Sequence, residues 1–95
     1  MMEMNRVYLN DLYDLYHSLL NEHEKLIFED YYQNDLSLSE IAENNSVTRN
    51  AIHKSLKSTE SKLLDYEDKL KVFEKKNKIL KAIDNNDINS IKNII

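Results

Sequence analysis

The sequence predicts an all-α bundle of about five to six helices, and three observations lead to that expectation. The chain has 95 residues, which is enough for one modest core and too few for a large multi-domain enzyme. It contains no Gly and no Pro, the residues that tight β-hairpin turns and Gly-rich phosphate loops need. Apolar residues recur at helical spacing along nearly all of the chain, and no segment has the pattern of a strand.

The composition also narrows the function. Without Cys there is no disulfide, thiolate zinc site or thiol nucleophile, and His17, His23 and His53 do not stand at metal-ligand spacings. No nucleophile has an organised base, so we expect no enzyme, no metal and no cofactor. No apolar run approaches the roughly 18 residues of a membrane span, and the acidic N-terminus does not resemble a signal peptide. We therefore expect a cytoplasmic protein with no membrane partner.

The net charge of −4 hides an uneven distribution along the chain. Residues 1–47 carry −8, residues 48–82 carry +5, and residues 83–95 carry −1. A basic segment in an acidic chain is compatible with nucleic-acid binding, since local fields matter more than the total charge.

The first two helices are expected over residues 7–20 and 21–33. The first has two neighbouring apolar rows: Tyr8, Leu12, Leu15 and Leu19, and Leu9, Tyr13, Tyr16 and Leu20. Asn21 stands three residues before Glu24, which predicts a capping box at the start of the second helix. The tyrosines in both segments lie among apolar neighbours, so they are expected to pack in the core.

Residues 38–57 predict a helix-turn-helix motif. Ser37 and Glu40 form a second capping box, residues 44–46 (NNS) end a short helix, and Thr48 is a suitable N-cap for the next one. In such a motif, small and apolar side chains bury the angle between the helices. The residues expected to do so are Ile41, Ala42, Val47, Ile52 and Leu56.

The outward side of the second motif helix is the candidate DNA-binding face. Its residues are Thr48, Arg49, Asn50, His53, Lys54 and Lys57. The second helix of this motif enters the major groove, where Arg49 can bind guanine and Asn50 can bind adenine through paired hydrogen bonds. The lysines are expected to contact phosphates, together with Lys62 and the serines at 37 and 39.

A heptad rhythm predicts one long helix from about Thr48 to Phe73. Its members are Ile52, Leu56, Thr59, Leu63, Tyr66, Leu70 and Phe73. The row either packs on the preceding helices or forms a seam with a second chain. At about 39 Å the helix is longer than the short helices before it can cover, so a homodimer through the long helix and the C-terminal helices is expected. We place a helix-turn-helix domain at residues 1–74 and a helical extension at 75–95. Within the extension, helices are expected near 75–83 and 87–95.

Several ungapped segments resemble the YlxM-like family of small bacterial helix-turn-helix proteins. They are residues 36–43 (LSLSEIAE), 47–52 (VTRNAI), 59–60 (TE) and 64–70 (LDYEDKL), with 12–16 (LYDLY), 18–20 (SLL) and 31–32 (YY) upstream. The motif is also similar to the promoter-binding C-terminal domain of sigma factors. The resemblance implies an all-helical, sigma-domain-like fold and a DNA-binding or regulatory role. It also implies a link by gene neighbourhood to the signal recognition particle GTPase. Components of the signal recognition particle are therefore candidate partners.

The chain departs from that family at the turn, where Asn45-Ser46 replaces the usual aromatic-Gly pair. If residue 46 is left-handed, Ser in place of Gly costs on the order of 1 kcal/mol. Two function classes stay open. The first is a transcriptional regulator that binds double-stranded DNA. The second is a protein–protein interaction module of the protein-targeting machinery without DNA binding, which the −8 charge of residues 1–47 favours.

Overall fold

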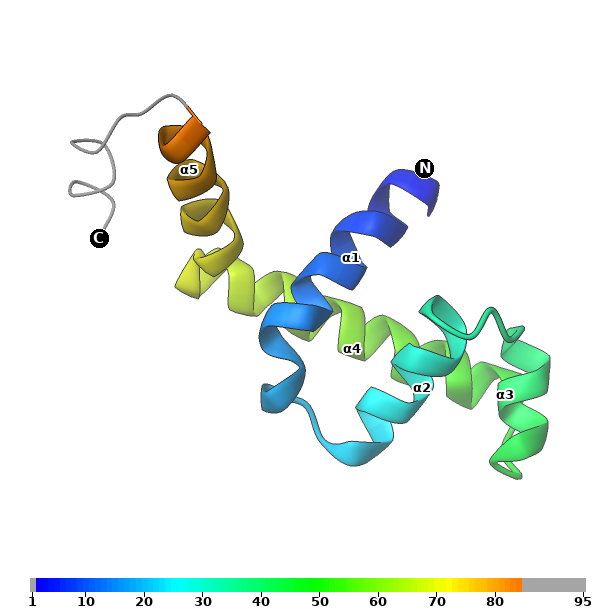
Figure 1. Cartoon of the computed structure of the whole chain (residues 1–95). Coiled ribbons are helices and arrows are strands. Elements are labelled where there is room, and N and C mark those ends of the chain that lie inside the picture. The colour runs from blue at the N-terminus through cyan, green and yellow to red at the C-terminus, as the bar shows by residue number, and fades with distance from the viewer. Residues whose placement is uncertain (1, 85–95) are drawn as a thin grey trace.

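The structure is a computed structural model that describes residues 2–84, with side chains over 6–83. It consists of α1 (Met2–Tyr16), a 3-10 helix (His17–Leu19), α2 (Glu22–Tyr32), α3 (Leu38–Asn44), α4 (Arg49–Leu70) and α5 (Val72–Asp84). No strand occurs within that range, and the predicted all-α class is confirmed. In Figure 1, α1 and α2 cross the long helix α4, with α3 near one end of α4 and α5 at the other.

The core lies where the first three helices pack against one side of α4. Its buried residues are Leu9, Leu12, Tyr13, Tyr16, Leu20, Ile27, Phe28, Ile41, Ala42, Ile52, Leu56 and Leu63. Thr59, the polar member of the heptad row, is fully buried and donates its hydroxyl to the Ser55 carbonyl at 2.9 Å. The row therefore packs within the monomer: its members are buried as far as Leu63, Tyr66 and Phe73 pack partly buried against the core, and Leu70 is 48% exposed.

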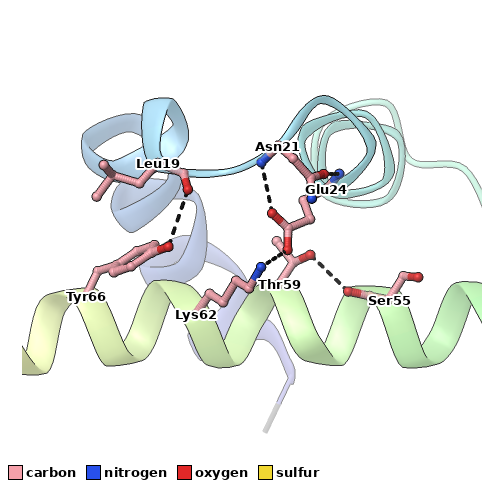
Figure 2. A network of polar contacts seen from close by, with 7 residues as sticks. All are labelled: Leu19, Asn21, Glu24, Ser55, Thr59, Lys62 and Tyr66. Carbon is pink, nitrogen blue, oxygen red and sulfur yellow. Dashed lines mark hydrogen bonds and ion pairs between the residues drawn. The ribbon is translucent and has the colours of Figure 1, made fainter.

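The start of α2 is held by the predicted capping box and by an ion pair to α4 (Figure 2). Asn21 Oδ1 accepts from the Glu24 amide at 2.8 Å, and the Asn21 amide donates to the Glu24 carboxylate at 2.9 Å. The other carboxylate oxygen of Glu24 pairs with Lys62. Burial alone would raise the pKa of Glu24, but the hydrogen bonds from Lys62 and Asn21 outweigh it and hold that pKa below its ordinary value. Lys62 is thus a structural residue here, not the free phosphate ligand expected from the sequence.

Three tyrosine hydroxyls donate to carboxylates on other helices and fix how the helices cross. The pairs are Tyr13 with Glu29, Tyr32 with Glu60, and Tyr16 with Glu67. Burial and the neighbouring carboxylates raise the pKa of Tyr13 and of Tyr32, so both hydroxyls remain protonated donors at neutral pH. The expected core tyrosines thus supply both apolar rings and specific polar contacts.

Arg6 fastens α1 to the C-terminal end of α2. Its guanidinium donates to the carbonyls of Tyr31 at 3.0 Å and Tyr32 at 3.2 Å, and to Asp35 at 2.9 Å. A cation at the carboxyl end of a helix is favourable because that end carries unpaired carbonyls and partial negative charge.

Left-handed residues end three of the helices without any glycine. Asp35, Ser46 and Lys71 have φ of 58°, 56° and 58°. Each carries a Cβ that crowds the backbone in this conformation, at a cost of roughly 1–2 kcal/mol per residue. The absence of Gly therefore leaves strain at the junctions after α2, α3 and α4.

Some predicted boundaries differ from those observed. The first α-helix ends at Tyr16 and continues as a 3-10 turn, which leaves Leu19 52% exposed instead of buried. Helix α4 ends at Leu70, three residues before the expected Phe73, because Lys71 is left-handed and α5 begins at Val72. Phe73 then packs on Tyr8, with ring centroids 5.3 Å apart. The helix expected near 87–95 lies outside the described residues.

Candidate nucleic-acid interface

The helix-turn-helix is formed by α3, a four-residue turn and the N-terminal half of α4. The predicted capping box begins α3: Ser37 Oγ accepts from the Glu40 amide at 3.1 Å, and the Glu40 carboxylate accepts from the Ser37 amide at 2.8 Å. Four of the five predicted core residues are buried: Ile41, Ala42, Ile52 and Leu56. The small side chain of Ala42 is buried, as expected for closely packed helices.

The turn between the helices has the hydrogen bonds of a Schellman motif. The Val47 amide donates to the Ala42 carbonyl at 3.0 Å, and the Ser46 amide donates to the Glu43 carbonyl at 3.2 Å. Ser46 takes the left-handed position that Gly usually fills, as the sequence comparison with the family suggested. Asn45 supports the turn by donating its side-chain amide to the Ile41 carbonyl at 2.7 Å.

Val47 is the exception among the predicted core residues. Its side chain is 45% exposed, so the prediction that it anchors the motif core is wrong. The left-handed Ser46 directs the chain outward just before α4, and Val47 therefore borders the exposed face instead of filling the helix angle.

Helix α4 begins with its predicted N-cap. Thr48 Oγ1 accepts from the Ala51 amide at 3.1 Å, which satisfies one of the free amides of the first turn. All six candidate DNA-binding residues are exposed: Thr48, Arg49, Asn50, His53, Lys54 and Lys57. Five of them lie within the first three turns of α4, at the end of that helix that lies near α3 (Figure 1).

The candidate residues differ in their electrostatic surroundings. Lys57 Nζ lies 3.4 Å from the carboxylate of Glu60, which also accepts the Tyr32 hydroxyl. Among the residues that the structure describes, no ion pair involves Arg49 or Lys54. The positive charges of Arg49 and Lys54 are therefore more available to a ligand than that of Lys57, which Glu60 partly neutralises.

Sequence reasoning missed two features of this surface. The pairing of Lys57 with Glu60 was visible as an i, i+3 spacing on one helix. Ala51 is exposed beside Asn50 in the first turn of α4, where a methyl group could contact the methyl of thymine.

The described residues contain no cluster of three or more side chains suited to hold a metal ion. Within residues 2–84, no helix is both long enough and apolar enough to cross a bilayer.

Comparison with known proteins gives a consistent family. Residues 3–94 match the family described as "Putative helix-turn-helix protein, YlxM / p13 like". A UPF0122 protein of Fusobacterium nucleatum is 48% identical over 77 residues, covering 81% of this chain and 75% of that protein. One from Malacoplasma penetrans is 42% identical over 91 residues, covering 93% and 85%.

A third relative, the UPF0122 protein of Clostridium botulinum, is 46% identical over 71 residues, covering 75% of this chain and 65% of the relative. The capping boxes, the turn and the two motif helices all lie inside the matched region. The chain therefore belongs to the YlxM/p13-like helix-turn-helix family.

Proposed function

We propose that this protein binds double-stranded DNA through the N-terminal end of α4 and regulates transcription in the cytoplasm. One observation carries the proposal: Arg49, Asn50 and Lys54 are exposed together at the start of the second motif helix. In helix-turn-helix proteins this is the end of the helix that meets base edges in the major groove.

The side chains divide into two roles. Arg49 and Asn50 are placed in the first turn, where their planar groups suit paired hydrogen bonds to guanine and adenine. Lys54 supplies a backbone contact to phosphate, and Lys57 a weaker one because Glu60 competes for its charge. Thr48 and His53 border the same surface and can form hydrogen bonds there.

The negative charge of the N-terminal half limits how much of the protein surface can contact DNA. Residues 1–47 carry −8, and α3 exposes Glu40 and Glu43 beside the turn. These carboxylates repel phosphates, so the duplex should approach along the N-terminal end of α4 and avoid the rest of α3. The protein is accordingly expected to make few phosphate contacts.

The experiment is selection of bound duplexes from a random pool, followed by titration of the selected sequence across a series of salt concentrations. An enriched motif with an affinity that falls as salt rises supports the proposal. With two to three phosphate contacts, the slope of log K against log salt should be about −2 to −3. No enrichment and no salt-sensitive binding would contradict it.

The alternative is a protein–protein interaction module of the targeting machinery, with no DNA ligand. The partial neutralisation of Lys57 by Glu60 and the exposed acids of α3 favour this second function. Capture of signal recognition particle components from extract, unchanged by nuclease treatment, would support it over DNA binding.

A further inference from the structure

Helix α5 carries several large apolar side chains that the rest of the bundle leaves exposed. Val72, Leu80 and Ile83 are 41%, 50% and 55% exposed, and their spacing places them on one side of the helix. A groove of about 300 Å³ lies on this side, and its lining residues are Val72, Lys75, Lys76, Ile79 and Leu80. Exposed apolar stripes of this kind, bordered by charge, are characteristic of interaction surfaces.

A second groove, of about 220 Å³, lies between α1 and α5 and shares Lys76 and Leu80 with the first. Its lining from α1 is Asp11, Asp14 and Leu15, and its lining from α5 is Phe73, Lys76, Asn77 and Leu80. Figure 1 shows α1 and α5 on the same side of α4, away from α3. The groove thus carries acidic side chains on its α1 side, one basic side chain on its α5 side, and apolar side chains on both.

Because its two sides carry opposite charges, this groove is complementary to the same groove in a second copy. A two-fold rotation places the acidic side of one copy against the basic side of the other, twice over, with the apolar stripes between them. If α5 of one copy packed directly on α5 of the other, Lys75 and Lys76 of the two copies would lie close together and repel each other. An interface of standard size takes about 20 residues or more from each side. Helix α5 has only 13, so α1 has to contribute. We propose that a second copy of this chain docks in the α1–α5 groove, forming a two-fold dimer.

The dimer would leave the candidate DNA-binding face free. Helix α4 has 22 residues, so its N-terminal end lies about 33 Å from the end that joins α5. Both copies would therefore present Arg49 and Asn50 away from the interface. The inference rests on α1 and α5 alone and stands whether or not DNA is bound.

The test is the molar mass of the full chain in solution, measured by sedimentation equilibrium from 1 to 100 µM with variants checked by circular dichroism. The wild type is expected at twice 11.3 kDa. Lys76→Glu and Asp14→Lys should each weaken association at least tenfold by opposing like charges across the axis. The double variant should recover part of it, because positions 14 and 76 again carry opposite charges while Asp11 stays acidic. Leu80→Glu should leave a folded monomer.

A matched control is Lys54→Glu, which reverses one charge at the far end of α4 and should leave the mass unchanged. A wild type that stays at 11.3 kDa up to 100 µM would overturn the proposal and leave the groove to a different protein. A dimer that persists in Leu80→Glu, or a double variant that associates no better than the single variants, would also overturn it.

Discussion

The hydroxyl of Tyr16 donates to the carboxylate of Glu67 at 2.6 Å, joining residues 51 positions apart at the junction of α1, α4 and α5. The same carboxylate accepts the amides of Phe73 at 3.0 Å and Glu74 at 3.1 Å, and the Tyr16 oxygen accepts the Val72 amide at 3.1 Å. One buried pair therefore satisfies three free amides at the start of α5 and sets the direction in which that helix leaves α4.

Replacing Glu67, the acceptor of this pair, should lower the stability of the protein more than replacing Tyr16, the donor. Glu67→Ala leaves the Tyr16 hydroxyl and two amides unpaired, and we expect the free energy of unfolding to fall by about 2 kcal/mol. Tyr16→Phe keeps the carboxylate with its two amide donors and leaves only the Val72 amide unpaired, so we expect a smaller loss of about 1 kcal/mol. Urea unfolding followed by circular dichroism measures both. Equal losses would mean that Glu67 does not hold the start of α5.

Stability should fall in acid partly because of Glu67. Burial raises the pKa of this carboxyl, but the hydrogen bonds from Tyr16, Phe73 and Glu74 outweigh burial and hold the pKa below the ordinary 4.5. A lowered pKa in the folded state gives a stabilisation that is present above pH 4.5 and lost as the pH falls through the folded value. Glu67→Gln should therefore narrow the difference in urea midpoint between pH 7 and pH 3. A variant with the full wild-type pH dependence would exclude this contribution.

Relief of the strained turn should stabilise the protein. Ser46→Gly removes the Cβ from a residue at φ 56°, and we expect a gain of about 0.5–1 kcal/mol after the added chain entropy is subtracted. Ser58→Gly is the matched control, because Ser58 is exposed within α4 and the change from Ser to Gly there should cost about 0.5 kcal/mol. Thermal or urea unfolding of both variants decides the matter. Equal destabilisation by both changes would show that Ser46 is not strained.

Freeing Lys57 should strengthen DNA binding if the proposed face is used. Glu60→Gln removes the charge that pairs with Lys57 at 3.4 Å but keeps an oxygen for the Tyr32 hydroxyl. We expect affinity to rise several-fold and the salt slope to steepen by up to about 1. Glu74→Gln, which frees Lys78 on α5, is the control and should leave affinity unchanged. An affinity that does not rise with Glu60→Gln would place Lys57 outside the interface.

The sequence predicted the features that follow from local spacing. Both capping boxes and the Thr48 cap depend on residues three positions apart, so they are visible without the fold. The buried row from Ile52 to Leu63 follows from helical periodicity in the same way.

The missed features depend on contacts between distant segments. Helix α4 ends at Leu70 because Lys71 is left-handed and because Glu67, fixed by Tyr16, caps the next helix. No composition rule predicts a lysine in that conformation. The exposure of Val47 likewise follows from the direction imposed by Ser46, and a periodicity argument cannot supply that direction.

The most direct test of the account measures binding of selected DNA by the double variant Arg49→Ala with Lys54→Ala, using fluorescence anisotropy at several salt concentrations. The matched control is Lys69→Ala with Lys78→Ala, which removes the same charge from residues already paired with Asp65 and Glu74. The account predicts that the first pair loses at least tenfold in affinity and has a shallower salt slope, while the control binds like the wild type. Equal binding by the two double variants would contradict the assignment of the α4 N-terminus as the DNA-binding face.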